Sequence, residues 1–288
     1  MALLAIRPEL ELEVPRGATA VPHTVMSFRD RTPTLRDDQL AVEEPLEIRL
    51  GGKSLAVTMR TPGHDEELVG GFLLSERVIE DRDDLEVIAH YAGPEDDPRT
   101  GNVINVLLRR PGPAIHQRLH RSVFTSSACG LCGKTSLDAI DMDLRPVTGD
   151  VTISLDALYA LGPALAEAQT TFERTGGLHA AALFNTTGRL LAVREDVGRH
   201  NAVDKVVGYM LLRGEVPLSR HVLMVSGRAS FEIMQKALAA RIAVVAAISA
   251  PSSLAVQFAL VNDMTLIGFL RPGRLNVYAN PHRVRQPA

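Results

Sequence analysis

The sequence is poor in cysteine and aromatic residues and has no long apolar run. Only two of its 288 residues are cysteines, Cys129 and Cys132, and there is no tryptophan. Two cysteines this close cannot form the disulfide framework of a secreted protein, and in a reducing cytosol such a pair is more often catalytic or metal-binding. The longest apolar stretch, near residues 242–248, is too short to span a membrane, and residues 2–6 are too short for a secretory signal. We therefore expect a cytoplasmic protein without a membrane segment.

The charge balance argues against nucleic acid as a partner. The formal net charge is -3 at pH 7, and aromatic residues, at 4%, offer few surfaces for stacking on bases. An anionic ligand would therefore need a local basic site. With 45% hydrophobic residues the chain can fill a substantial core, and its length suits two domains better than one.

The first 121 residues predict a lead-in followed by a small α+β unit. Residues 1–45 mix prolines with scattered charges and show no sustained period, so we expect an extended, partly disordered lead-in. The α+β unit covers residues 46–121, and close backbone packing would explain why Gly70 and Gly71 interrupt its helix. The expected elements are a hairpin at residues 46–50 and 55–59, a helix from residue 65, and strands at residues 85–91 and 103–108.

The second half predicts a Cys loop and an α/β domain. Residues 122–150 are expected to form the loop and a linker, with a short helix near residues 136–140. Helix and strand patterns then alternate over residues 151–288, which indicates a compact layered sheet. Helices are expected at residues 155–172, 201–213, 230–241 and 253–263, and strands at residues 178–184, 190–193, 221–226, 243–249 and 265–270.

The stretch SSACGLCGK at residues 126–134 holds both cysteines in a run of small residues. A free thiol is only a few per cent thiolate at neutral pH, so a reactive cysteine needs a positive environment, for which Arg121 and Lys134 are the local candidates. A buried pair of inert thiols is the plain alternative, but closely spaced cysteines in a Gly/Ser loop rarely serve packing alone. The pair therefore predicts chemistry.

Three kinds of chemistry suit two thiols at this spacing. Structural zinc would need two more tightly spaced Cys or His ligands, and the histidines are scattered singly, so we expect no metal site. A thioredoxin-like motif should open a helix after a first βα unit, whereas this pair lies in a mid-chain loop. The redox interpretation is therefore the second choice. A persulfide carrier needs a reachable nucleophilic cysteine and no metal, which the sequence offers.

Four polar turns follow expected strands of the second half. Residues 194–205 and 226–232 each lie where a strand leads into a helix, a usual place for ligand sites in α/β sheets, and residues 249–253 and 269–274 follow the last two strands. Helix capping and surface charge explain each turn alone. Together the four favour a shared pocket.

His179 invites comparison with the zinc deaminases, in which a His-x-Glu precedes a Pro-Cys-x-x-Cys. The comparison fails because Ala181 stands where the proton-shuttling Glu would be, and because the cysteine pair comes before the histidine rather than after it. His179 is therefore expected to be a core or pocket histidine.

Several of these segments together resemble the FdhD family, the formate dehydrogenase accessory sulfurtransferases. They are the Cys pair, TPGHDEEL at residues 61–68, REDVGRHNAVDK at 194–205, SGRAS at 226–230 and the turn at 269–274. Their joint order is far more specific than any one of them. The resemblance covers the chain from about residue 40 to its end. It implies a cytidine deaminase-like layered α/β domain at the C-terminal side, without the deaminase zinc chemistry, beside the smaller α+β unit.

The resemblance also implies a function. Such proteins accept sulfur from a cysteine desulfurase as a cysteine persulfide and pass it to the molybdenum bis guanine dinucleotide cofactor that formate dehydrogenase needs. By resemblance, Cys129 carries the persulfide, Cys132 assists or resolves, and the protein pairs as a homodimer. A chaperone that only holds the molybdenum cofactor and a CxxC thiol redox protein remain the alternatives.

By the same resemblance, the turn at residues 269–274 binds the GDP-like part of that cofactor. Arginines flank the turn, and a guanidinium can grip a pyrophosphate through paired, charge-assisted hydrogen bonds. The ring of Phe269 could line the pocket. The alternative is that Arg271 and Arg274 are solvent-exposed charges without a ligand. The expected cofactor-binding residues are Phe269, Leu270, Arg271, Pro272, Gly273 and Arg274.

Overall fold

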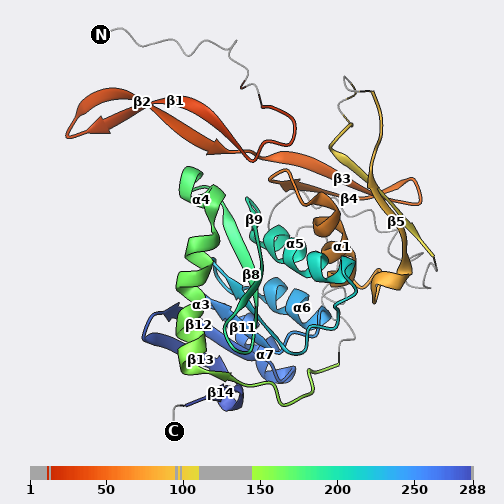
Figure 1. The fold of residues 1–288 in the computed structure, drawn as a ribbon, viewed down its shortest axis with the longest axis vertical. Helices are drawn as coiled ribbons and strands as arrows, with labels where there is room; N and C mark the ends of the chain where they lie inside the picture. The colour runs from red at the N-terminus through yellow and green to blue at the C-terminus, as the bar shows by residue number, and fades with distance from the viewer. Residues whose placement is uncertain (1–11, 13, 95–96, 98, 110–144, 287–288) are drawn as a thin grey trace.

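The computed structural model describes residues 12, 14–94, 97, 99–109 and 145–286 (Figure 1). Its largest sheet has six strands in the order β13-β12-β11-β10-β8-β9. Strands β10, β11 and β12 are parallel, whereas β8 and β13 run antiparallel to their neighbours. The strands are β8 (His179–Asn185), β9 (Leu190–Asp196), β10 (His221–Val225), β11 (Val244–Ala247), β12 (Thr265–Arg271) and β13 (Arg274–Ala279).

Helices cover both faces of this sheet, and the central strand β11 is accordingly apolar and buried along its whole length. The strands β9, β10, β11 and β12 point the same way and progress in one direction across the sheet, with β8 between β9 and β10. Right-handed crossovers therefore place their three connecting helices on one face. Those helices are α5 (Arg199–Leu212), α6 (Phe231–Ala239) and α7 (Ser253–Val261), and α3 (Leu155–Ala168) lies on the other face (Figure 1). The predicted mixed α/β class is confirmed. The finer likeness to the cytidine deaminase fold stays a prediction.

A four-stranded sheet of order β4-β3-β6-β5 forms the N-terminal unit. Its helix α1 packs against α5, and a side chain on Gly71 or on Gly208 would overlap the backbone of the opposite helix. The close packing expected for the glycine pair is therefore confirmed at Gly71. The unit consists of β3 (Glu44–Leu50), β4 (Lys53–Arg60), α1 (Asp65–Ser75), η1 (Arg82–Asp84), β5 (Leu85–His90) and β6 (Val103–Leu108).

One hydrophobic cluster runs through both units, from the buried leucines and isoleucines of β3 to Ala279 of β13. The predicted boundaries between the small unit, the Cys loop and the α/β domain stay a prediction. Two short strands close the described C-terminal part: β7 (Ile153–Ser154) pairs in parallel with β14 (Val284–Arg285), just after η3 (Pro281–Arg283). Among the described residues, no helix is long and apolar enough to cross a membrane.

The sequence predicted an extended lead-in over residues 1–45 and gave no sign of the hairpin that residues 20–41 form. These residues form an antiparallel hairpin of β1 (Ala20–Arg29) and β2 (Thr32–Ala41), which extends away from the body in Figure 1. Its turn residues, Asp30 and Arg31, both have positive φ, at 47° and 68°. Such a turn normally carries Asn or Gly, so the sequence lacked the usual hairpin signal.

Two further differences lie in the second half. The helix expected over residues 155–172 is broken: α3 ends at Ala168, and a separate helix α4 (Thr170–Thr175) follows. The strand β13 was not expected, because residues 269–274 were interpreted only as a strand end and a turn. The short helix predicted near residues 136–140 lies outside the described residues.

Candidate functional site at the edge of the six-stranded sheet

The two cysteines lie outside the described residues, as do the two basic residues proposed to activate them, Arg121 and Lys134. The roles given to Cys129 and Cys132 therefore stay predictions. What the structure describes is the other half of the expected site, where the four polar turns meet.

The four turns lie together along one edge of the sheet, because β9, β10, β11 and β12 all end there. Ser226, after β10, is fixed to β8: its amide donates to the Ala180 carbonyl at 2.9 Å, and its hydroxyl accepts from the Ala180 amide at 2.9 Å. The Ser249 carbonyl, after β11, accepts from the Phe269 amide of β12 at 3.2 Å. The carboxyl end of parallel strands is the usual ligand-binding edge of an α/β sheet.

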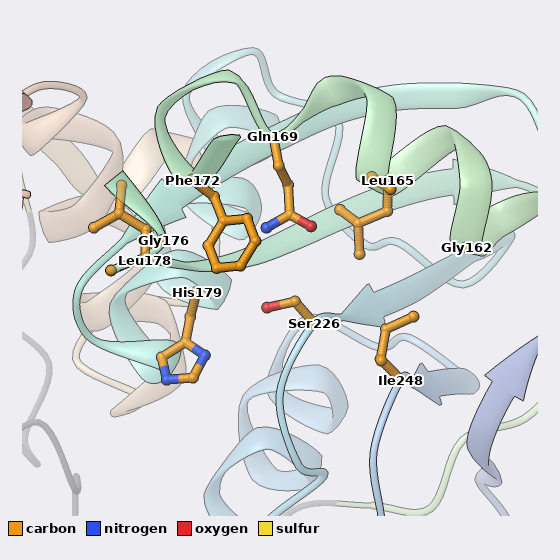
Figure 2. A pocket seen from close by; sticks show the side chains of 11 residues that line it. Gly162, Leu165, Gln169, Phe172, Gly176, Leu178, His179, Ser226 and Ile248 are labelled. Carbon is orange, nitrogen blue, oxygen red and sulfur yellow. The ribbon is translucent and has the colours of Figure 1, made fainter. Parts of the chain in front are cut away.

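A cavity of about 480 Å³ opens at this edge, beneath the break between α3 and α4 (Figure 2). Apolar side chains form most of its wall, and three neutral polar groups face it: the Gln169 amide, the His179 ring and the Ser226 hydroxyl. This combination is typical of small-molecule sites. The remaining lining residues are Gly162, Leu165, Ala166, Phe172, Gly176, Gly177, Leu178 and Ile248.

His179 is a pocket histidine, as expected. Burial lowers the pKa of its ring, and the positive charges of Arg199 and His200 lower it further. The ring is therefore neutral at pH 7 and offers one donor and one acceptor nitrogen. It cannot supply a fixed positive charge to a ligand.

The turn at residues 269–274 is the tip of the β12–β13 hairpin and adjoins the cavity. Nη1 of Arg271 donates to the Ile248 carbonyl at 2.7 Å, and the Ile248 side chain lines the cavity. Leu270 is fully buried, so only its backbone is available to a ligand, whereas Phe269 is 40% exposed and is not among the lining residues. Arg274 is exposed.

None of the residues 194–205 is among the lining residues of this cavity. The carboxylate of Asp196 is fully buried and accepts from four donors: the amides of Thr61 and Gly198, the Asn201 side chain, and Nζ of Lys205 at 2.7 Å. Lys205 also donates to the Thr61 carbonyl at 2.8 Å. We call this cluster, with the ion pair described next, the polar seam, because it joins the N-terminal unit to α5.

The second part of the polar seam lies between α1, α5 and α6. Asp204 accepts from Nζ of Lys236 at 2.7 and 2.8 Å and from the Ser75 hydroxyl at 2.8 Å. Burial raises the pKa of Asp204, while Lys236 and Ser75 pull it down. A buried pair of this kind gains little net stability but fixes the relative positions of the three helices.

Glu232 and His200 meet where α5 and α6 begin. Nε2 of His200 lies 3.5 Å from the Glu232 carboxylate and 3.3 Å from the Ser230 hydroxyl. Although burial raises the pKa of Glu232, hydrogen bonds from His200, from its own amide and from Ser230 outweigh it and lower the pKa to about 2. Nearby, the buried Nε of Arg199 has no partner in the described part of the chain.

Comparison with known proteins decides the family. The model of the FdhD/NarQ family matches residues 41–285. The chain belongs to this family. A sulfur carrier protein FdhD of Streptomyces avermitilis is 53% identical over 273 residues, covering 93% of this chain and 96% of that protein. The protein of the same name from Mycobacterium tuberculosis is 49% identical over 255 residues, covering 86% and 92%.

The fold agrees with that of a solved structure. A crystal structure assigned to a formate dehydrogenase accessory protein from Desulfotalea psychrophila superposes with a TM-score of 0.73, covering 93% of this chain and all of that one. Its sequence is 23% identical, so this likeness concerns the fold alone.

Sequence reasoning missed two residues of the cavity, Gln169 and Phe172. The sequence predicts both within one continuous helix, and the helical period gives no sign of the break at Gln169. It also missed the role of Glu195, whose carboxylate accepts from the amides of Thr171 and Phe172 at 2.9 and 2.7 Å. The only signal was an acidic residue in a polar segment, which ordinary surface charge explains equally well.

Proposed function

We propose that this protein is a sulfurtransferase that carries sulfur as a persulfide on Cys129. The sulfur comes from a cysteine desulfurase and goes to the molybdenum bis guanine dinucleotide cofactor of formate dehydrogenase, which is bound as cargo. Support comes from the family, from relatives named sulfur carrier proteins, and from the lone pair of closely spaced cysteines. A cytoplasmic location and a homodimer belong to the same proposal.

Sulfur loading is an exchange without net oxidation. The Cys129 thiolate attacks the terminal sulfur of the desulfurase persulfide, a new S–S bond forms, the old one breaks, and the desulfurase cysteine leaves as thiolate. Cys132 assists or resolves: its thiolate can attack the Cys129 sulfur, which frees the terminal sulfur as hydrosulfide and leaves a disulfide for a thiol to reduce.

The observation that carries the cofactor end of the proposal is the juxtaposition of a neutral cavity and an arginine-flanked turn. Arg271 uses only Nη1 toward the carbonyls of Ile248 and Leu270, so its Nε and Nη2 have no partner within residues 145–286. Arg274 lies across the hairpin tip from it. Two guanidinium groups at a turn suit a diphosphate, and the adjoining cavity suits the base to which that diphosphate is linked.

Mass spectrometry tests the sulfur-carrying step. After incubation with a cysteine desulfurase and cysteine, the wild-type protein should gain one sulfur atom, about 32 Da, on Cys129. The gain should vanish in Cys129→Ala and persist in Cys132→Ala, the matched control. In cells, Cys129→Ala should yield formate dehydrogenase without its molybdenum sulfur.

The alternatives give different results in the same experiment. Fully active formate dehydrogenase in the Cys129→Ala background would leave a cofactor chaperone whose cysteines only tune the loop. An intramolecular disulfide without any sulfur gain would favour a CxxC redox protein.

A further inference from the structure

The Gln169 side chain is the unexplained polar group of the cavity. Gln169 is only 8% exposed, and its amide has no hydrogen-bond partner among the described residues. Figure 2 shows this amide directed into the cavity, toward the same space as the Phe172 ring and the Ser226 hydroxyl. The Gln169 amide atoms are not among the fully buried atoms that lack a partner, so the amide is accessible from the cavity. An accessible amide that no protein group binds can donate to and accept from a ligand with a complementary polar edge.

The break between α3 and α4 is what turns this amide inward. Gln169 has φ −85° and ψ 66°, outside the helical region, and its side chain caps neither helix. Helix α4 therefore starts afresh, and its first free amides, those of Thr171 and Phe172, are bound by the Glu195 carboxylate. Because Glu195 belongs to β9, the sheet itself holds α4 at the angle that the break requires.

The polar groups of the cavity are all uncharged. Gln169 and Ser226 are neutral by nature, and the lowered pKa of His179 keeps its ring neutral at pH 7. The Ser226 hydroxyl accepts from the Ala180 amide, so its own proton is available to a ligand. Such a cavity suits an uncharged heteroaromatic ring with donors and acceptors on its edge, whereas the phosphates belong at the arginine-flanked turn.

We infer that Gln169 binds the polar edge of the guanine base of the cargo nucleotide, and that Glu195 is a positioning residue that acts through α4. The inference rests on the proposed nucleotide site and adds to it a division of labour: the cavity under α4 holds the base, and the turn at residues 269–274 holds the diphosphate. Phe172, carried by the same helix, lies beside the base at the mouth of the cavity.

Calorimetry with two probes separates base from diphosphate. GDP carries both parts, and inorganic pyrophosphate carries only the second. We expect Gln169→Leu to weaken GDP binding about 10- to 100-fold, the loss of one or two buried hydrogen bonds, and to leave pyrophosphate binding unchanged. Gln169→Asn, which keeps the amide but shortens its reach, should lose GDP affinity in the same direction and serves if the leucine variant does not fold.

The positioning role has its own variant and control. Glu195→Gln should weaken GDP binding about 3- to 10-fold, because one anionic acceptor for the α4 amides is lost, again without effect on pyrophosphate. Glu173→Gln, an exposed change on α4, is the matched control and should bind both probes like the wild type. A merely structural effect of Glu195→Gln would weaken both probes alike and would overturn this role.

The results of these measurements separate the role of Gln169 from the existence of the nucleotide site. If Gln169→Leu and Gln169→Asn keep full GDP affinity while Arg274→Ala weakens both probes, the inference is wrong and the nucleotide site stands. If the wild-type protein binds neither GDP nor pyrophosphate, the cofactor end of the proposed function fails, and the inference fails with it.

Discussion

The polar seam and the cavity contain similar residues in opposite states. In the seam, Asp196 is fully buried and each of its carboxylate oxygens is bound twice, partly by the N-terminal unit. In the cavity, the residue Gln169 is mostly buried, but its amide opens onto the cavity and has no hydrogen-bond partner within the described residues. The saturated carboxylate of Asp196 serves the fold, whereas the Gln169 amide is the group that we infer to bind a ligand. The two groups therefore differ in how far the protein itself satisfies their hydrogen bonds.

The largest effect should follow from breaking the polar seam. Asp196→Ala leaves Lys205 as a buried, uncompensated charge, so we expect the free energy of unfolding to fall by about 3–5 kcal/mol in urea denaturation. Asp150→Ala, an exposed carboxylate, is the control and should change it by less than about 0.5 kcal/mol. A loss below about 1 kcal/mol for Asp196→Ala would show that this carboxylate does not hold the polar seam together, and the contrast between seam and cavity would fail.

A smaller effect should appear at Glu232, which lies at the sheet edge yet is bonded like a seam residue. Its pKa is about 2 in the folded protein, below the ordinary value of 4.5, so its charged form stabilises the fold above about pH 4.5. That contribution, at most about 3 kcal/mol, should be lost as the pH falls from about 4.5 toward 2. We expect the difference in unfolding free energy between wild type and Glu232→Gln to shrink over this window. The exposed Glu86→Gln is the control, and a difference that does not vary with pH would contradict the assignment.

The smallest effect on stability should come from the turn beside the cavity. Arg274 is exposed and makes no contact that the fold needs, so Arg274→Ala should change the free energy of unfolding by less than about 0.5 kcal/mol. Its GDP affinity should nevertheless fall by about 1.5–3 kcal/mol, the scale of a lost charged hydrogen bond, in calorimetry. Unaltered GDP binding in both Arg271→Ala and Arg274→Ala would remove this turn from the site and direct attention to Arg228 and His200.

Much of the element order could be predicted because its signals are local. The hairpin around Gly51 and Gly52 and the alternation of helices and strands after residue 178 both follow from short-range periodicity, and the structure confirms them. The misses have equally local causes. The hairpin turn at Asp30 and Arg31 was not predicted because neither residue is typical of positive φ. The break at Gln169 was not predicted because the helical period of α3 continues through it.

The polar turns show where sequence reasoning ends. Their order along the chain suggests a shared pocket, because strands that end at one edge bring their loops together. The four turns do meet at one edge, but Ser226 is the only one of their residues that lines the described cavity. The chain alone could not show that Glu195 would bind α4, since its partners lie 23 and 24 residues away on a separate helix. The chain alone also could not show that the Arg271 guanidinium is held beside the cavity, because its position depends on a hydrogen bond to the carbonyl of Ile248.

The sequence by itself determined the family, the mixed α/β class and the segments that carry the chemistry, because motif order and periodicity are properties of the chain. Only the tertiary structure decided which polar residues of the segment 194–205 join the seam and which groups face the cavity. The physical reason is that a buried polar group needs a partner at hydrogen-bond distance, and here those partners come from distant segments: Thr61 for Asp196, and Lys236 for Asp204.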